Sequence, residues 1–399
     1  MKKCKKVVKE MIYICPKEKC SGCGLCADIC PQKAITMKEK KLTGHFVPEV
    51  DSRKCINCSL CHEKCPSNSV PHLYKTKNTY VAWKKDVEST KTSSSGGIAA
   101  ELYSCAIKQG YYVTGVILDE DFRAKMILSN TTEYLEKFKL SKYMQADCKG
   151  IFSGIKDCFK LKQQVLFIGT PCQCDAARKL AGERYGDFLT TVELICHGVP
   201  SQKIFKEYVN DVIASNKVID KLLFRTELGE ELVLYSQNKV IWKRRSFQDD
   251  YLTAFQEGIL SNEKCYQCPY ATPNRGSDLT IGDFWGIGEV RSFSRPQCRV
   301  SVLLVNTEKG KQLLELCDGL YLEERDNCEA VNGNGQLKGP AKKSAKYELF
   351  WNVYRRKGIK SAMDCTVHRK TNYAYLKDKY WGGIKRSIKR VLVKTGVMR

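Results

Sequence analysis

Short apolar runs alternate with stretches of helical spacing over most of this chain, and the alternation predicts strands and helices in turn. Strands are predicted at 80–83, 111–118, 165–168 and 191–195. Helices are predicted through Ala99, Leu102, Ala106 and Ile107, through Ala176, Ala177 and Leu180, and from Ser201 onward. Strand, loop and helix in succession indicate an α/β fold, in which functional residues lie in loops at the carboxyl ends of the strands.

Two copies of one cysteine pattern, Cys-x2-Cys-x2-Cys-x3-Cys-Pro, precede this region. They begin 35 residues apart, and they comprise Cys20, Cys23, Cys26, Cys30 and Pro31, and Cys55, Cys58, Cys61, Cys65 and Pro66. The run holds 4Fe–4S clusters in two-cluster bacterial ferredoxins, where the fourth cysteine of each copy ligates the other cluster. The pattern therefore assigns Cys20, Cys23, Cys26 and Cys65 to a first cluster (cluster one), and Cys55, Cys58, Cys61 and Cys30 to a second (cluster two).

Other uses of these cysteines fit the pattern less well. Disulfides need an oxidising compartment, and the start MKKCKKVVKE lacks the long apolar region of a secretion signal. Zinc sites use isolated Cys-x2-Cys pairs a dozen or more residues apart. We therefore expect a cytoplasmic iron–sulfur protein. Six apolar residues are expected to keep water from the clusters: Ile14, Ile29, Ile35, Ile56, Leu60 and Val70.

The charge of the chain is concentrated at its C-terminal end. The 399 residues carry a net charge of +23, and residues 340–399 hold 17 Lys and Arg against 3 Asp and Glu. The apolar residues Trp381, Ile384, Ile388, Val391 and Leu392 fall at helical spacing opposite Lys385, Arg386, Lys389, Arg390 and Lys394. This is typical of a helix at 380–399 on the anionic inner face of a membrane, and packing on the protein itself is the alternative. Nucleic acid is a weaker interpretation, because no nucleic-acid-binding fold accompanies the charge.

Four further cysteines are candidate metal ligands. Cys172 and Cys196 each follow a predicted strand, and Cys265 and Cys268 form a Cys-x2-Cys-Pro. Neighbouring strand ends bring residues together, so these four thiols are placed to hold a third metal site. The alternatives are that Cys172 and Cys196 are small buried residues, that the pair is half of a zinc knuckle, or that Cys174 replaces Cys172.

Polar residues next to these motifs are weaker candidates. Ser93 to Gly97 stands at a predicted helix N-terminus, where exposed N–H groups bind phosphate, although a plain N-cap is the alternative. His197 adjoins a candidate ligand, as a proton donor or a structural residue. Asp283 ends an apolar strand, where it faces the same site or caps the following turn.

Taken together, these motifs resemble the beta-subunit family of the deazaflavin (coenzyme F-420) hydrogenases and dehydrogenases. The resemblance covers roughly 75–340 and is carried by Ser94-Ser95-Gly96-Gly97-Ile98, Ser141-Lys142-Tyr143 with Gln145, Gly169-Thr170-Pro171-Cys172-Gln173, Cys196-His197-Gly198-Val199-Pro200-Ser201, and Cys265 through Gly286. It implies FAD in an α/β domain near Ser94, Ser95, Gly96, Gly97, Ser141, Lys142 and Thr170. It also implies a third 4Fe–4S cluster on Cys172, Cys196, Cys265 and Cys268.

With this resemblance, four regions are expected: a ferredoxin-type domain at 1–75, the two parts of a flavin-binding domain at 76–160 and 161–340, and a basic helical tail at 341–399. The leading hypothesis is an oxidoreductase that takes electrons from a redox donor protein through 4Fe–4S clusters to FAD and a small-molecule substrate. Lys142 would stabilise reduced flavin and His197 would supply a proton. Bacterial relatives with this ferredoxin fusion look like polysaccharide-biosynthesis proteins. The alternatives are a non-catalytic electron-transfer subunit and a binding protein in which the clusters are structural.

Overall fold

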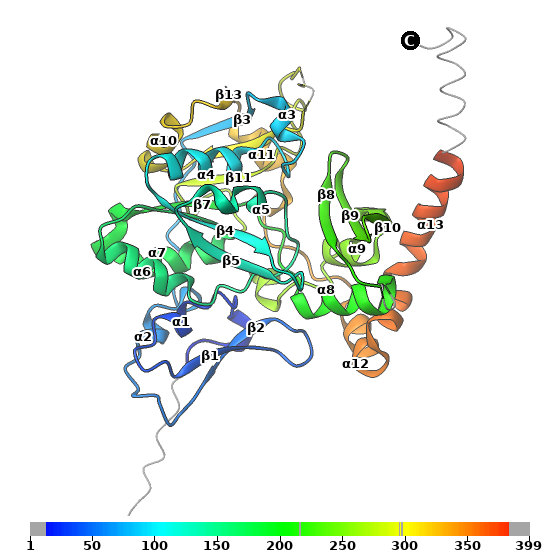
Figure 1. The fold of residues 1–399 in the computed structure, drawn as a ribbon, viewed down its shortest axis with the longest axis horizontal. Coiled ribbons are helices and arrows are strands. Elements are labelled where there is room, and N and C mark those ends of the chain that lie inside the picture. The colour runs from blue at the N-terminus through cyan, green and yellow to red at the C-terminus, as the bar shows by residue number, and fades with distance from the viewer. Residues whose placement is uncertain (1–12, 215–216, 295, 297, 383–399) are drawn as a thin grey trace, which may run out of the picture. The chain divides into compact units, whose positions relative to one another are not determined.

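Eight strands form the largest sheet of the protein, in the order β13-β3-β12-β11-β7-β6-β4-β5 (Figure 1). A computed structural model describes residues 13–214, 217–294, 296 and 298–382. The strands are β3 (Asn78–Lys84), β4 (Tyr112–Leu118), β5 (Ala124–Ser129), β6 (Val165–Gly169), β7 (Leu189–Leu194), β11 (Leu279–Asp283), β12 (Ser301–Val305) and β13 (Leu320–Glu324). Only β4, β6, β7 and β11 run parallel to one another, and the outer pairings are antiparallel. The fold is therefore mixed α/β, and the predicted strands at 80–83, 111–118, 165–168 and 191–195 are confirmed.

The central strand β6 is apolar throughout because helices cover both faces of the sheet. Leu166 and Ile168 of β6 pack on one side with helix α4 (Ile98–Lys108) and α10 (Glu308–Glu315), whereas Val165 and Phe167 pack on the other with α6 (Ile151–Lys160) and α7 (Pro171–Tyr185). Successive strand residues point to opposite faces, so a strand buried on both sides loses the polar alternation of a surface strand.

The chain divides into two compact units. The first takes in residues up to 139, 145–197 and 262–341, and it contains the ferredoxin-like segment together with the large sheet. The second takes in the described residues of 140–144, 198–261 and 342–382.

The ferredoxin-like segment contains a two-stranded sheet and two short helices. These are β1 (Ile35–Glu39), β2 (Phe46–Val50), α1 (Leu25–Asp28) and α2 (Leu60–Glu63). The remaining helices of the first unit are α3 (Val87–Thr90), α5 (Leu135–Phe138) and α11 (Asn327–Gly333). Leu25 and Ile29 pack into the same core cluster as α6 and α7. The segment is therefore built into the first unit rather than tethered to it.

The second unit contains a three-stranded antiparallel sheet that the sequence pattern did not predict. Its elements are β8 (Lys221–Thr226), β9 (Gly229–Ser236), β10 (Lys239–Arg245), α8 (Gln202–Tyr208), α9 (Asp250–Gln256), α12 (Tyr347–Met363) and α13 (Arg369–Lys377). Phe205, Phe224 and Tyr251 form an aromatic centre for it. Most of the predicted tail helix, residues 383–399, lies outside the described part of the chain. Among the described residues, no helix combines the length and apolar character needed to cross a membrane.

Candidate functional site

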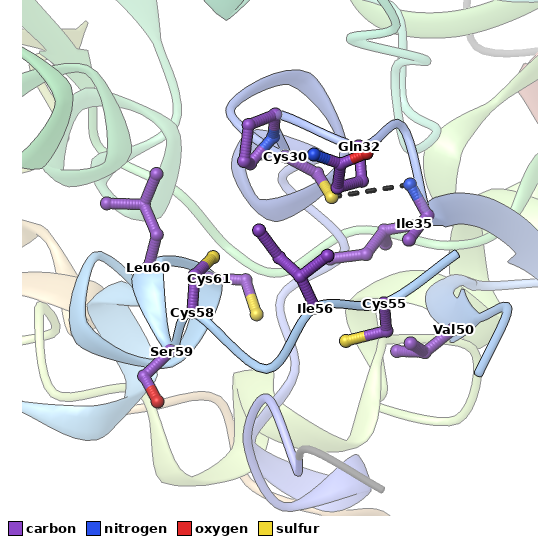
Figure 2. Close-up of a pocket in the computed structure, with 12 residues that line it drawn as sticks. Cys30, Gln32, Ile35, Val50, Cys55, Ile56, Cys58, Ser59, Leu60 and Cys61 are labelled. Carbon is purple, nitrogen blue, oxygen red and sulfur yellow. Dashed lines mark hydrogen bonds between the residues drawn. The ribbon is translucent and has the colours of Figure 1, made fainter. Parts of the chain in front are cut away.

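The cysteines assigned to cluster two surround one pocket. Cys30, Cys55, Cys58 and Cys61 all line it, and Figure 2 shows them around it together with Ile35, Ile56 and Leu60. The backbone N–H of Ala34 donates to Cys30 Sγ at 3.3 Å. Both the donor set and the N–H···S bond suit a thiolate-bound cluster, because hydrogen bonds to the ligand sulfurs stabilise their negative charge.

The cysteines assigned to cluster one also lie together, and a fifth thiol joins them. Cys26 interacts electrostatically with Cys20, Cys23 and Cys65. Cys15 is buried and forms side-chain hydrogen bonds with Cys20 and Cys65. These bonds are the largest cause that lowers the pKa of Cys20 to about 7 and that of Cys65 to about 6. Low thiol pKa values favour the thiolate form that binds iron.

The apolar shield around the clusters is partly as expected. Ile14 and Ile35 pack with Cys15 and Cys20 in one buried cluster. The expectation for Val70 is wrong, because its side chain is 90% exposed. Val70 follows the second proline and leads into the connection to β3, so it points away from the thiols it was expected to cover.

Cys172 and Cys196 leave two neighbouring parallel strands at matching positions. Gly169 of β6 pairs with Glu193 of β7, and each cysteine comes three residues after its member of this pair. The competitor Cys174 is fully buried, and its thiol contacts the carbonyls of Gly169 and Val192 at 3.8 and 3.5 Å. Cys174 therefore packs between the strands, and Cys172 is the accessible thiol of the pair.

The segment that carries Cys265 and Cys268, which we call the knuckle, is held near these strand ends by side-chain contacts. It begins as the 3-10 turn Glu263–Gln267, and Cys268 follows directly. The Tyr270 hydroxyl donates to the Asp175 carboxylate of α7 at 2.7 Å. Further along, Arg275 Nε lies 2.6 Å from Glu193 Oε1 of β7, and both side chains are fully buried. The knuckle is thus held against α7, which contains Cys172, and against β7, which precedes Cys196.

The two groups of cysteines adjoin each other in the first unit. Cys172 interacts electrostatically with Cys23 on one side and with Cys268 on the other, and after burial it is the next cause that raises the pKa of Cys268. Cys148, which is buried, interacts electrostatically with both Cys23 and Cys172. Gln173 Nε2 contacts Cys148 Sγ at 3.2 Å, while its Oε1 accepts from the Thr170 N–H at 3.0 Å. These electrostatic interactions link Cys23, Cys148, Cys172 and Cys268, which we call the row of thiols, from the ferredoxin-like segment to the strand ends.

No three His, Cys, Asp or Glu side chains among the described residues converge as they would on a single metal ion. Cys30, Cys55, Cys58 and Cys61 are instead spread around one pocket. This is the arrangement a cubane requires, because each thiolate binds a different iron atom.

The Ser94 to Gly97 loop is fixed against strands of its own sheet. Ser95 Oγ donates to the Val300 carbonyl at 2.9 Å, and Ser301 Oγ accepts from the Gly96 N–H at 2.9 Å. A Cβ on Gly96 would lie 2.4 Å from the Ala82 carbonyl oxygen, so glycine is required there for close approach to β3. Arg299 donates to the Ser93 carbonyl at 2.8 Å. The loop therefore has a structural role, and a cation stands beside the start of α4.

The Ser141-Lys142-Tyr143 segment belongs to the second unit, where Tyr143 anchors it. The Tyr143 hydroxyl accepts from Arg225 at 3.0 Å, and its carbonyl accepts from the Tyr251 hydroxyl at 2.7 Å. Burial lowers the pKa of the neighbouring Lys142 to about 7. His197, at the last position of the first unit's middle segment, is exposed.

Two residues that dock the ferredoxin-like segment escaped the sequence-based reasoning. Gln145 accepts from the Phe46 N–H at 2.9 Å and donates to the Ser21 carbonyl at 3.0 Å. Asp28 accepts from the Gly150 and Phe152 N–H groups at 3.0 and 2.9 Å, so it caps α6 from outside. Gln145 stands out only as part of a motif, and no local pattern marks Asp28.

Comparison with known proteins finds two family models that match parts of the chain. Residues 19–69 match the family model described as "4Fe-4S dicluster domain". Residues 162–328 match the family model for the C terminus of the beta subunit of coenzyme F420 hydrogenase/dehydrogenase. The second range contains Cys172, Cys196, Cys265 and Cys268, whereas Ser94 to Gly97 and Ser141 to Tyr143 lie outside it. Parts of the chain are thus similar to a 4Fe–4S dicluster domain and to the beta subunit of coenzyme F420 hydrogenase/dehydrogenase.

One curated relative is a subunit of the F(420)H(2) dehydrogenase of Methanosarcina mazei, which is 22% identical over 231 residues. The match covers 53% of this chain and 65% of the relative, so the chain spans slightly less than two thirds of that protein. Among solved structures, a chain of the F420-reducing [NiFe] hydrogenase complex of Methanosarcina barkeri is similar with a TM-score of 0.45 and 19% identity, over 75% of this chain and 94% of that one. An archaeal O-phosphoseryl-tRNA(Sec) selenium transferase gives a TM-score of 0.21 and 10% identity, over 84% and 65%. At these TM-scores neither likeness establishes a shared fold.

Proposed function

We propose that the chain is an iron–sulfur flavoprotein oxidoreductase with three 4Fe–4S clusters and one FAD. The observation that carries the proposal is the row of thiols in the first unit, in which Cys172 adjoins Cys23 of the ferredoxin-like segment and Cys268 of the knuckle. When bound, the clusters supply single-electron transfer and FAD converts single electrons into a hydride.

The side chains and backbone of the protein fit the clusters in three ways. They provide thiolate donors in three sets of four, with Cys172, Cys196, Cys265 and Cys268 as the third set. They provide N–H donors to sulfur, since the backbones of Gly22, Leu25 and Ser67 hydrogen-bond to Cys20, Cys23 and Cys65. They also exclude water, because the apolar side chains around cluster one are largely buried.

For FAD, the residues that favour binding are the cations beside the Ser94 to Gly97 loop. Arg299 donates to Ser93, Lys139 Nζ donates to Thr92 Oγ1 at 3.3 Å, and the Lys84 side chain lies against Gly97. Cations at the N-terminus of an 11-residue helix suit a diphosphate. In this proposal Thr170 of the first unit borders the flavin, and the exposed His197 would supply a proton. The roles that the family resemblance implies for Ser141 and Lys142, which belong to the second unit, stay predictions.

Iron and flavin content test the proposal directly. The protein is purified without oxygen, and about twelve irons and one FAD per chain are expected. Cys172→Ala and Cys268→Ala should each lower the iron to about eight while the ferredoxin-type signal remains. Cys328→Ala, which removes an exposed cysteine, should leave the iron unchanged. About eight irons without flavin in the unaltered protein would contradict the proposal and favour a non-catalytic electron-transfer subunit.

The remaining parts of the proposal concern partners and substrate. A redox protein donates the electrons, and the acceptor is a small molecule of polysaccharide biosynthesis, in line with the family resemblance. Association with an anionic membrane through residues 380–399 is tested with phosphatidylserine vesicles. The full chain should be retained more strongly than a chain ending at 379, and equal retention would refute this part.

A further inference from the structure

A buried lysine joins the ferredoxin-like segment to the knuckle. Lys264 precedes Cys265 in the turn Glu263–Gln267, and its side chain is only 8% exposed. Its ammonium donates to Ser67 Oγ at 2.7 Å. Ser67 lies two residues after Cys65, and both its N–H and its hydroxyl contact the Cys65 sulfur. Lys264 therefore reaches across from one set of cysteines to the other.

The position of the ammonium group is fixed by further contacts. The Ser67 hydroxyl that accepts from Lys264 donates in turn to the Lys19 carbonyl at 2.7 Å. Asn262 Oδ1 accepts from the Lys264 N–H at 3.3 Å, and Lys264 Nζ lies 5.8 Å from the centre of the Tyr270 ring. A lysine loses much rotamer freedom when it is held in this way, so contacts of this number indicate a defined place for its charge.

The charge of Lys264 acts on ligand cysteines of both groups. It interacts electrostatically with Cys65, assigned to cluster one, and with Cys268, assigned to the third cluster. Both sulfurs are largely shielded from water, where a charge acts over a longer distance than it does at the surface. Lys54, beside Cys55 of cluster two, does not have such a position, because its side chain is exposed.

We propose that Lys264 is a positioning residue that raises the reduction potentials of cluster one and the third cluster together, relative to cluster two. Reduction adds one negative charge to a thiolate-bound cubane, and a nearby buried ammonium stabilises that charge. The part that concerns the third cluster rests on the proposed function, whereas the part that concerns cluster one does not.

Potentiometric titration followed by EPR tests the proposal on the full chain. Lys264→Gln removes the charge at similar length, Lys264→Arg keeps it, and Lys54→Gln removes an exposed charge next to cluster two. In Lys264→Gln, the ratio of reduced to oxidised cluster one at a fixed potential should fall about tenfold, a shift of about 59 mV for one electron. The third cluster should shift in the same direction, and cluster two should not move. Lys264→Arg should restore most of the difference.

The outcomes separate this proposal from the proposed function. If cluster one does not shift in Lys264→Gln, or if cluster two shifts equally, the proposal is overturned, even in a protein with twelve irons. If the protein holds eight irons and cluster one alone shifts, the third cluster is refuted while the role of Lys264 at cluster one stands.

Discussion

The ion pair between Arg275 and Glu193 should hold the knuckle in place, and replacing Arg275 by methionine tests this. Glu193 is fully buried on β7, where it also accepts from Ser277 Oγ at 3.1 Å and from Thr280 Oγ1 at 3.2 Å. Arg275 in turn donates through Nη1 to the carbonyls of Tyr270 and Thr272, both at 2.9 Å. The substitution therefore leaves the Glu193 carboxylate buried without its positive partner. It also removes the hydrogen bonds that hold the loop after Cys268.

The magnitude follows from the burial of both partners. Removing one member of a buried pair costs about 3 to 5 kcal/mol, because the remaining charge is left without compensation. The two hydroxyl donors to Glu193 remain, which favours the lower half of this range. At roughly 2 to 4 °C per kcal/mol for a unit of this size, the melting temperature should fall by about 6 to 16 °C.

The assay is thermal unfolding at one scan rate, followed both by circular dichroism and by the loss of cluster absorbance. Arg275→Met with Glu193→Gln should recover part of the loss, since the second change removes the stranded charge while keeping an acceptor for the hydroxyls. Lys77→Met is the matched control, because the Lys77–Glu308 pair is exposed, and it should leave the melting temperature unchanged. Equal losses in Arg275→Met and Lys77→Met would refute the reasoning.

Three further predictions concern single positions. Gly22→Ala should release iron from the ferredoxin-like segment. Gly22 has φ +68°, and an alanine Cβ there would meet Gln145 Nε2 at 2.3 Å and the Phe46 carbonyl at 2.5 Å. Gly110→Ala is the control for backbone strain alone, because Gly110 has φ +78° and open space around it. Cys15→Ala should keep the iron content but lower the potential of cluster one, because it removes a thiol that hydrogen-bonds to Cys20 and Cys65, and a loss of four irons would instead make Cys15 a ligand. Lys142→Met should abolish a rise of stability with pH between about 7 and 10.5, measured by denaturant unfolding. The folded state releases the Lys142 proton near pH 7, whereas the unfolded state keeps it up to about pH 10.5. The free energy of unfolding therefore rises by at most about 1.4 kcal/mol per pH unit in that window and is constant below it. If the free energy of unfolding of the variant rises with pH as steeply as that of the unaltered protein, the pKa assigned to Lys142 is wrong.

Local patterns predicted much of this protein, because ligand spacing and strand periodicity are local properties. Spacing alone groups Cys30 with Cys55, Cys58 and Cys61, and the structure places all four around one pocket. The docking of the ferredoxin-like segment could not be predicted in this way, since Gln145 and Phe46 are 99 residues apart and Asp28 and Gly150 are 122 apart. Such polar contacts leave no periodic signal in the sequence.

The three-stranded sheet of the second unit was missed for a different physical reason. In β10, the charged segment Lys243-Arg244-Arg245 is typical of a solvent-exposed loop rather than of a strand. A shift of register between Val240 and Trp242 also breaks the alternation of apolar and polar residues. Arg244 stacks on the rings of Trp242 and Tyr375, so its stem and guanidinium cover aromatic surface that an apolar residue would otherwise cover. A pattern that counts arginine as polar cannot detect this use.

The thiols assigned to cluster two and those beside cluster one differ in burial. Cys58, assigned to cluster two, is exposed, whereas Cys20 and Cys15 beside cluster one are buried, and Cys172 comes next toward the strand ends. In the proposed function, Cys58 is the exposed thiol that a donor protein would reach, whereas Lys264 lies near Cys65 and Cys268. If Lys264 favours reduction of cluster one over cluster two, the step from cluster two to cluster one leads toward a site where negative charge is better stabilised.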